Sequence, residues 1–364
     1  MRIVCLPLDS RPCCCRFPRD LAAWSGDTCV LPRPSEMDDF VRPANHMDTV
    51  SFLERELPGA DAAVISVDHL CYGSLLASRE EAVPLETALS RLDWLASLRR
   101  QFPEIPFHLD NVILRATISA LSSDQLEVYE AMKVYSYQSD IGYETGSVDA
   151  LRLAQEAAAR IPGEIRRKYH AVRRRNHAIN RSCVELVQQG VFDTLSLLME
   201  DAQPYGFHRA EQRELRSLIG GDPRIFLRNG ADEGGALSVM KAALNGQEVP
   251  AEILYIGRSE DDFIAQYEDR PFRENLESAL QYAHVIPTPG AGQVLAVACP
   301  PVGVQARIGE TTCPEAIPGM AQTLDRLIDE GREVYLLDLL SRNGGSIPLV
   351  ETMRHADRLA GYSG

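Results

Sequence analysis

The sequence contains no CxxC pair, and its nine cysteines are an odd number that includes the adjacent Cys13, Cys14 and Cys15. Adjacent cysteines cannot easily pair with each other, so we expect neither a disulfide scaffold nor a zinc ribbon. The sequence also lacks a run of 18 apolar residues, and its N-terminus has no basic stretch followed by a long apolar segment. These absences predict a protein of the reducing cytoplasm with no membrane-spanning helix and no secretion signal.

Positive charge is scarce, because 37 Lys and Arg residues stand against 52 Asp and Glu residues and give a net charge of −15. A field of this sign repels phosphate backbones and anionic lipids, so we expect no nucleic acid and no membrane as a partner. The GxGxxG, Walker and GxSxG motifs are also missing. We therefore expect no nucleotide cofactor and no serine-hydrolase site.

Short apolar runs alternate with amphipathic helical patterns along the whole chain, which is typical of parallel strands covered on both faces. The predicted strands are Arg2–Leu6, Ala62–Val67, Phe107–Leu109, Thr194–Met199, Arg224–Leu227, Glu252–Ile256, Val294–Ala298 and Glu333–Leu337. We predict a single α/β domain over residues 1–364. Eight strands suit a (β/α)8 barrel, and an open doubly wound sheet in two α/β halves is the alternative.

The alternation is interrupted after the third predicted strand. Residues 118–190 contain helical periodicity and a basic run from Arg166 to Arg181, but no clear strand. One interpretation is a helical insertion with a solvated basic face. The other is a lid whose arginines contact an anionic substrate.

Polar side chains occupy the first positions past the end of most of the predicted strands. In parallel α/β proteins these carboxyl ends are where ligands bind. Carboxylates, amides and guanidiniums are suited to hydrogen-bond sugar hydroxyls, so we expect a small, carbohydrate-like substrate. The candidate substrate-binding residues are Asp9, Arg11, Asp68, His69, Tyr72, Asp110, Asn111, Arg115, Tyr205, Asn229, Asp232, Glu233, Asp338 and Asn343.

Glu200 and Asp201 are the candidate catalytic residues. Two nearby carboxylates separate their pKa values, so one can act as an acid while the other stays ionised. Glycoside cleavage needs this division of labour. The alternative interpretation is that both residues cap the following helix and pair with Arg209 or Arg213.

Two further functions are weighed against a glycosidase. Asp9, Asp68, His69 and Asp110 would supply the ligands of a metal-dependent hydrolase. With a single strand-end histidine, however, we expect hydrogen-bonded pairs and no bound metal. The other function is a non-catalytic binder of sugars or small polar ligands. The scarcity of tryptophan, with two residues in all, favours a small substrate over a polysaccharide.

Several motifs in a fixed order resemble the bacterial DUF4127 family. They are PLDSRP at 7–12, DHLCYGSLLASR at 68–79, EDAQPYGFHRAEQ at 200–212, NGADEGG at 229–235, YEDRP at 267–271 and DLLSRNGG at 338–345. Family members tend to have a second Asp in place of Ser10 and an Asp-Asp pair in place of Glu200-Asp201. They also tend to continue past a point like residues 361–364 into a Trp-Asn-Thr motif, so we expect part of a site beyond this sequence.

An acidic pair at the end of a fourth barrel strand is similar to the arrangement in substrate-assisted N-acetylhexosaminidases. This analogy implies that Glu200 orients the substrate acetamido group and that Asp201 protonates the leaving oxygen. Tyr205 would stack on a sugar ring or donate to the acetamido oxygen. The sequence thus predicts a glycoside hydrolase-like enzyme for a small saccharide, with N-acetylated sugars as the first candidates.

Overall fold

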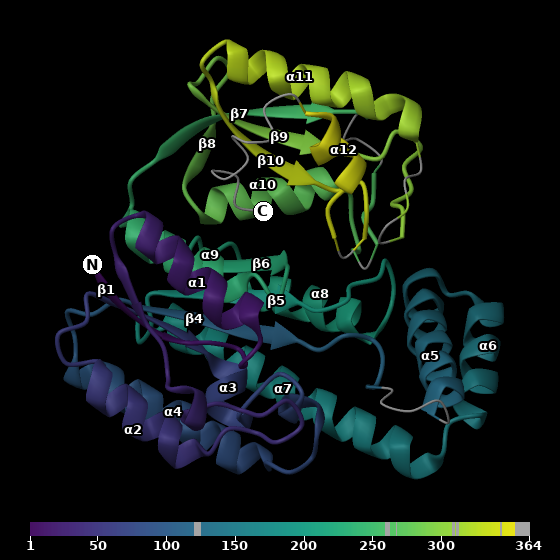
Figure 1. Cartoon of the computed structure of the whole chain (residues 1–364). Helices are drawn as coiled ribbons and strands as arrows, with labels where there is room; N and C mark the ends of the chain where they lie inside the picture. Colours follow the sequence, from purple (N-terminus) through teal and green to yellow (C-terminus); the bar gives the residue numbers. More distant parts are fainter. Residues whose placement is uncertain are drawn as a thin grey trace. The chain divides into compact units, whose positions relative to one another are not determined.

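The computed structural model describes residues 1–119, 125–258, 263–266, 268–307, 310, 313–342 and 344–353. By its internal contacts the chain divides into two compact units, Met1–Gly246 and Gln247–Gly364. Each unit is built around a parallel β-sheet of its own (Figure 1).

The first unit contains a six-stranded parallel sheet in the order β2-β1-β3-β4-β5-β6. Its strands are β1 (Arg2–Leu6), β2 (Thr28–Val30), β3 (Ala62–Ser66), β4 (Phe107–Ile113), β5 (Thr194–Met199) and β6 (Ile225–Asn229). β1 pairs with β2 on one side and with β3 on the other, since Ile3 is in register with both Cys29 and Ala62. The strand order therefore reverses at β1, which makes this sheet doubly wound.

Helices cover both faces of this sheet (Figure 1). The helices of this unit are α1 (Pro12–Trp24), α2 (His46–Glu56), α3 (Val67–Tyr72), α4 (Leu85–Gln101), α5 (Leu126–Thr145), α6 (Val148–Ala159), α7 (Gly163–Gln188), α8 (Phe207–Ile219) and α9 (Gly234–Leu244). Of these, α5 and α6 pack against each other and lie beside the sheet rather than over it (Figure 1). Successive residues of β1 point to opposite faces. Ile3 and Cys5 belong to the core shared with α1 and α9, whereas Val4 and Leu6 belong to the larger core under α2, α4 and α7. This two-sided burial is why the strands are apolar at consecutive positions.

The second unit has a four-stranded parallel sheet in the order β10-β9-β7-β8. Its elements are β7 (Val249–Ile256), α10 (Phe272–Tyr282), β8 (Val285–Pro287), β9 (Gln293–Ala298), α11 (Ile317–Asp329), β10 (Glu333–Asp338) and α12 (Ile347–Thr352). α10 and α11 lie on opposite faces of the sheet (Figure 1). One of its cores joins Val294 and Ala296 of β9 to Met320 and Leu324 of α11.

All eight predicted strands are present and the α/β class is confirmed, but the predicted barrel is wrong. The strands belong to two sheets whose order is that of open α/β folds, as in the alternative prediction. β2 and β8 were not predicted, because strands of three residues are too short to show a periodicity. β2 pairs with β1, and β8 pairs with β7, the first strand of the second sheet. The strand order therefore reverses at the first strand of each sheet, whereas in a (β/α)8 barrel consecutive strands are neighbours all the way round.

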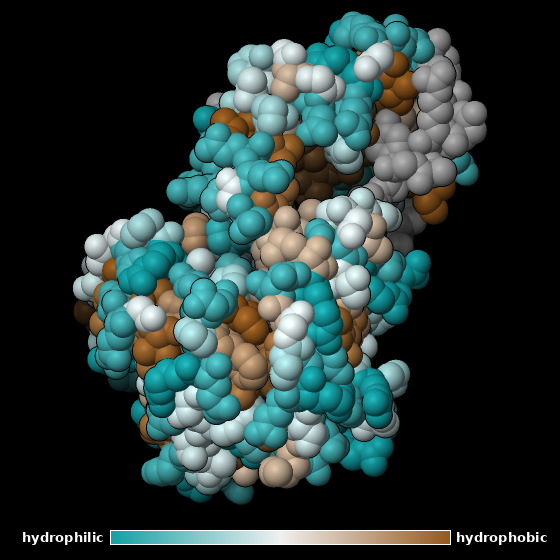
Figure 2. Space-filling model, turned by 90° about the vertical axis from the view of Figure 1, so that its left-hand side faces the viewer, coloured by the Kyte–Doolittle hydropathy of each residue, from teal (hydrophilic) through white to brown (hydrophobic). Residues whose placement is uncertain are grey.

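The predicted helical stretch at 118–190 contains α5, α6 and α7, between β4 and β5. α7 packs against both of these strands, so it is the crossover helix of a β-α-β unit, and α5 and α6 are additional to it. In the part of the chain that the structure describes, no helix is long and apolar enough to cross a membrane. Hydrophilic residues predominate on the face shown in Figure 2, with smaller hydrophobic patches between them.

Candidate functional site

The reversal of strand order in the first sheet determines where a crevice forms. In doubly wound folds the loops at the carboxyl ends of the strands diverge at this point, and ligands bind between them. Here the reversal lies between β1 and β3. The polar residues past β1, β3, β4, β5 and β6 all belong to this edge of the first unit.

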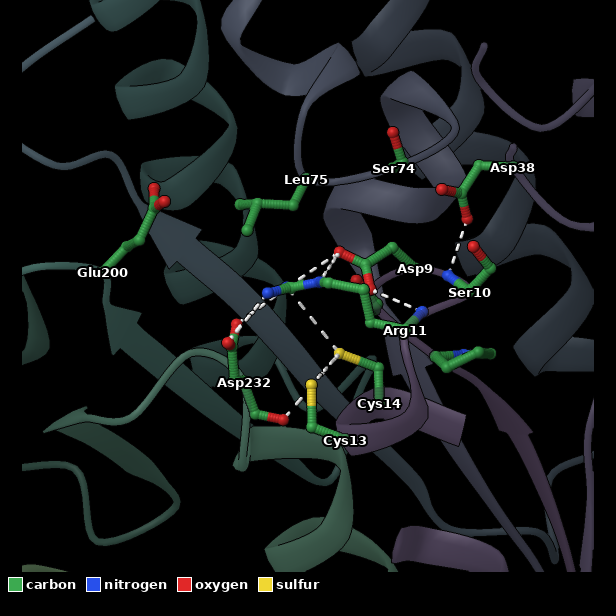
Figure 3. Close-up of polar contacts among 12 residues, drawn as sticks. Asp9, Ser10, Arg11, Cys13, Cys14, Asp38, Ser74, Leu75, Glu200 and Asp232 are labelled. Carbon is green, nitrogen blue, oxygen red and sulfur yellow. Dashed lines mark hydrogen bonds and ion pairs between the residues drawn. The ribbon is translucent and has the colours of Figure 1, made fainter. Parts of the chain in front are cut away.

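Arg11 links the ends of β1 and β6. Its guanidinium donates two hydrogen bonds of 2.8 Å to the carboxylate of Asp232, and its Nε donates to the Asp9 carboxylate oxygens at 2.9 and 3.0 Å (Figure 3). Burial by itself would lower the pKa of Arg11, but the hydrogen bonds to Asp9 and Asp232 outweigh it and raise that pKa. The backbone of Arg11 is extended and Pro12 begins α1, so the chain turns at this arginine. The structure thus brings together three of the predicted site residues.

Asp38 belongs to the same edge and was missed by the prediction. Its carboxylate accepts a hydrogen bond of 2.7 Å from the backbone N–H of Ser10 (Figure 3). Burial raises the pKa of Asp38, and the charge of Asp9 adds to this rise. Asp38 lies eight positions after the end of β2. The sequence did not predict this strand, and a residue so far past a strand end does not follow the pattern by which the other site residues were predicted.

Glu200 and Asp201 come directly after β5, and each is held by a different arginine. Arg79 donates to Oε1 of Glu200, whereas Arg115 donates to Oδ2 of Asp201 at 2.8 Å. Asp201 has a φ of 40°, a left-handed conformation that is unusual for a residue other than glycine. The Glu200 side chain is nearly buried at 9% exposure, whereas that of Asp201 is 46% exposed.

The helix-capping interpretation of this pair is not supported. α8 begins at Phe207, and its N-cap residue is Gly206, several positions after the two carboxylates. Arg213, which was considered as their partner, instead pairs with Asp140 and Glu144 of α5.

Arg79 interacts with most of the charged residues at these strand ends. It lies in the short 3-10 helix η2 (Ala77–Arg79), and burial together with the charge of Arg115 lowers its pKa to about 9. Arg11 acts in the same direction, while Asp201 and Asp232 oppose the shift. Charged residues past the ends of five strands therefore act on one another and form one group. We call the six residues Arg11, Arg79, Arg115, Glu200, Asp201 and Asp232 the strand-end cluster.

The additional helix α5 supports the loop that comes after the carboxylates. Gly206 donates its N–H to Asp140 at 2.9 Å, and Phe207 donates to Ser136 at the same distance. Tyr205 packs edge-to-face on Tyr137, with ring centroids 5.6 Å apart. Tyr205 therefore has a structural neighbour, and its proposed contact with a sugar ring stays a prediction.

A cavity of about 480 Å³ lies next to the strand-end cluster, between the segment after β4 and the helices α5 and α7. Within the described part of the chain, its charged wall residues are Arg79, Glu80, Arg115, Lys168 and Arg173. Since Arg79 and Arg115 also hold Glu200 and Asp201, the carboxylate pair lies beside this cavity. Its volume is in the range of small-ligand sites.

The basic run on α7 fits neither of its two interpretations completely. Arg173 is buried, pairs with Glu211, and donates to the backbone carbonyls of Leu114 and Arg115 at 3.1 and 2.6 Å. Arg175 is also buried and donates to the carbonyls of Ser78 and other residues near η2. These arginines fix the loops that carry Arg115 and Arg79, so they are not a solvated face.

Asp68, His69 and Tyr72 lie in the buried helix α3. Asp68 accepts a hydrogen bond of 2.7 Å from the N–H of Val112, and burial raises its pKa to about 7. Nδ1 of His69 lies 2.8 Å from the carbonyl oxygen of Pro7, and burial lowers the pKa of this histidine to about 4. Their contacts are to the protein itself, and their role in substrate binding stays a prediction.

The prediction that Asp110 and Asn111 lie past a strand end is wrong, because both residues lie within β4. Being adjacent on a strand, they point to opposite faces. Asp110 accepts a hydrogen bond of 2.8 Å from Ser238 of α9, and burial raises its pKa to about 6. Asn111 donates to Asn180 of α7 at 2.6 Å. The residue past the end of this strand that reaches the cluster is Arg115.

The remaining predicted residues are distributed over both units. Asn229 ends β6, and the exposed Glu233 precedes α9. Asp338 ends β10 in the second unit, where its carboxylate accepts hydrogen bonds from the N–H groups of Leu340 and Ser346. Asn343 lies outside the described residues.

The proposed metal ligands do not gather. Within the described residues, no group of three or more His, Cys, Asp or Glu side chains is placed to hold a metal ion. Asp9 binds Arg11, whereas Asp68 and Asp110 accept from Val112 and Ser238. The geometry therefore gives the metal-dependent hydrolase no support.

Fold and site define a doubly wound α/β protein with a cluster of charged residues at the carboxyl ends of the strands of its first sheet and a cavity beside that cluster. The chain matches, over residues 3–364, the model of a family described as "Protein of unknown function (DUF4127)". The chain belongs to this family, in agreement with the resemblance of its motifs. No curated protein and no solved structure gives a significant match.

Proposed function

We propose that this protein is a hydrolase that cleaves a small saccharide at the strand-end cluster, with Glu200 and Asp201 as its catalytic carboxylates. The observation that carries this proposal is the placement of the pair. Both carboxylates lie at one strand end, each is oriented by its own arginine, and a cavity of about 480 Å³ lies beside them. Paired carboxylates at a small-ligand cavity are the arrangement that glycoside cleavage requires.

The exposure of the two side chains supports a division of roles. Asp201 is the more exposed carboxylate, so it can approach the leaving oxygen and protonate it as general acid. Glu200 is nearly buried and has one oxygen, Oε2, without a partner among the described residues. That oxygen can accept a hydrogen bond from the substrate and orient it. Arg11 and Asp232 are partly exposed and supply groups for sugar hydroxyls.

The proposal is tested by measuring the turnover of aryl glycosides, N-acetylhexosaminides included. We expect Asp201→Asn to lower kcat by about 10³-fold while the circular dichroism spectrum stays unchanged. Asp149→Asn on α6 is the matched control, because it makes the same change at an exposed carboxylate and should leave kcat unaltered. Full activity of Asp201→Asn would refute the proposal, and saccharide binding without any turnover would favour a non-catalytic binder.

A further inference from the structure

The charge of the cavity beside the strand-end cluster is opposite to the charge of the chain. The chain has a net charge of −15, yet among the residues that the structure describes the charged wall residues are Arg79, Arg115, Lys168 and Arg173 against one carboxylate, Glu80. The carboxylates that pair with three of these cations, namely Glu200, Asp201 and Glu211, are not among the wall residues. A ligand inside the cavity therefore meets mostly positive groups.

The four cations are not equally available to a ligand. Arg173 uses its guanidinium on Glu211, Tyr169 and two backbone carbonyls, so it positions the loop after β4. Lys168 is 41% exposed and pairs with Glu80 at the rim. Arg79 donates to Glu200 and to Oγ of Ser119. Arg115 donates to Asp201 and to the carbonyl oxygen of Ile118. A guanidinium has five N–H donors, so each of these two arginines keeps donors that no described residue uses. These last two guanidiniums, with Lys168, are left to contact a ligand.

Arg79 and Arg115 also repel each other. Burial is the main cause that lowers the pKa of Arg79 to about 9, and the charge of Arg115 is the next. A neutral ligand would leave this repulsion in place and would desolvate both cations further. An anion between them would offset both costs, because guanidinium groups bind carboxylate and phosphate oxygens with charge-assisted hydrogen bonds.

We infer that this cavity seats an anionic group of the substrate, a carboxylate or a phosphate, between Arg79, Arg115 and Lys168. The substrate class is then an acidic saccharide of small size, such as a uronate or a sugar phosphate. That the anion is part of a substrate rests on the proposed function, whereas the seat itself rests on the cavity and its charges. The location of the seat beside Glu200 and Asp201 would hold the acidic sugar next to the catalytic pair.

The inference is tested by isothermal titration calorimetry of the full chain with D-glucuronate, D-glucose 6-phosphate and D-glucose. We expect both acidic sugars to bind at least about tenfold more tightly than D-glucose, and to bind more weakly as salt is added. The tighter of the two identifies the anion as carboxylate or phosphate. Equal binding of all three sugars, or no binding of either acid, would overturn the inference.

Substitutions of the cavity residues test whether the anion binds at Arg115 and Lys168. Arg115→Gln should weaken binding of the preferred acid about tenfold, and the half-exposed Lys168→Gln, which leaves the buried contacts intact, about threefold. Arg152→Gln on α6 is the matched control, since this exposed arginine pairs with Glu156 and should leave binding unchanged. Unaltered binding in both cavity variants would overturn the seat.

The two proposals fail in different ways. Asp201-dependent turnover of neutral glycosides, with no preference for acids, would overturn the anion seat and leave the hydrolase proposal intact. Anion binding that depends on Arg115, without turnover of any glycoside, would support the seat and contradict the hydrolase.

Discussion

The two sheets of this protein repeat one strand order and differ in the residues past their strand ends. β2-β1-β3-β4 in the first unit corresponds to β8-β7-β9-β10 in the second, so both sheets reverse at their first strand. The residues past β1 are Pro7 to Arg11 with their buried Asp9, whereas Gly257 comes after β7 and Cys299 with two prolines comes after β9. The topology brings strand ends together in both units, but the side chains at those ends determine the chemistry.

Packing at the reversal shows the same difference. Gly257 has a φ of 91°, and a Cβ there would lie 2.2 Å from Cε of Met320 and 2.5 Å from the carbonyl oxygen of Cys299. In the second unit, backbone and an apolar helix side chain thus approach closely. In the first unit the reversal is bordered by Arg11 and Asp232, whose side chains are partly exposed. The two reversals thus differ in the side chains that border them, with an ion pair in the first unit and a close backbone approach in the second.

The largest effect on stability is expected at Arg11. Arg11→Gln leaves the carboxylates of Asp9 and Asp232 without their shared cation, and should lower the free energy of unfolding by about 2–3 kcal/mol. Arg332→Gln in the second unit breaks a pair with Glu252 and should cost about 1 kcal/mol.

Chemical denaturation of both variants measures this difference. Adding Asp232→Asn to Arg11→Gln should recover part of the loss, because it removes one of the two unpaired charges. Equal losses in Arg11→Gln and Arg332→Gln would mean that the two regions do not differ in their dependence on charge.

An intermediate effect, with opposite sign in the two units, is expected for Asp→Asn substitutions. Burial raises the pKa of Asp68 to about 7, so its contribution to stability is full below about pH 4 and is lost as the pH rises to about 7. Asp68→Asn should therefore stabilise the protein by about 2 kcal/mol at pH 8 and by little at pH 4. An asparagine oxygen can still accept from Val112.

The matching variant in the second unit is Asp338→Asn. Asp338 accepts from the N–H groups of Leu340 and Ser346 with its two oxygens, and an amide has only one acceptor oxygen. This variant should destabilise the protein by about 1–2 kcal/mol at pH 8. Denaturation at several pH values checks both predictions, and a destabilised Asp68→Asn at pH 8 would contradict the first.

The smallest effect concerns two residues in the left-handed region, Asp201 at φ 40° and His284 of the second unit at φ 55°. At each position the Gly variant should be more stable than the Ala variant by about 1 kcal/mol, because only glycine adopts this conformation without strain. Thermal unfolding measures the difference. Both Asp201 variants should lose turnover, while both His284 variants should keep it. Loss of turnover in the His284 variants would remove the functional distinction between the two positions.

The elements were predictable where the pattern is local. β1 and β5 have the predicted bounds, and Glu200 and Asp201 come after β5 as expected. β4 was predicted too short, because Asp110 and Asn111 interrupt its apolar run while their partners, Ser238 and Asn180, lie far along the chain. A polar residue inside a buried strand cannot be distinguished from a strand end unless its partner is known.

The amino-acid sequence by itself determined the α/β class, the family and the position of Glu200 and Asp201 directly after a strand, because hydrophobic periodicity and motifs are properties of neighbouring residues. The tertiary structure decided that the strands form two open sheets rather than one barrel. It also decided that Glu200 meets Arg79, a residue 121 positions away. Strand order depends on the direction in which each crossover connection turns, and ion pairs of this kind depend on which side chains are buried together. A local sequence pattern contains neither kind of information.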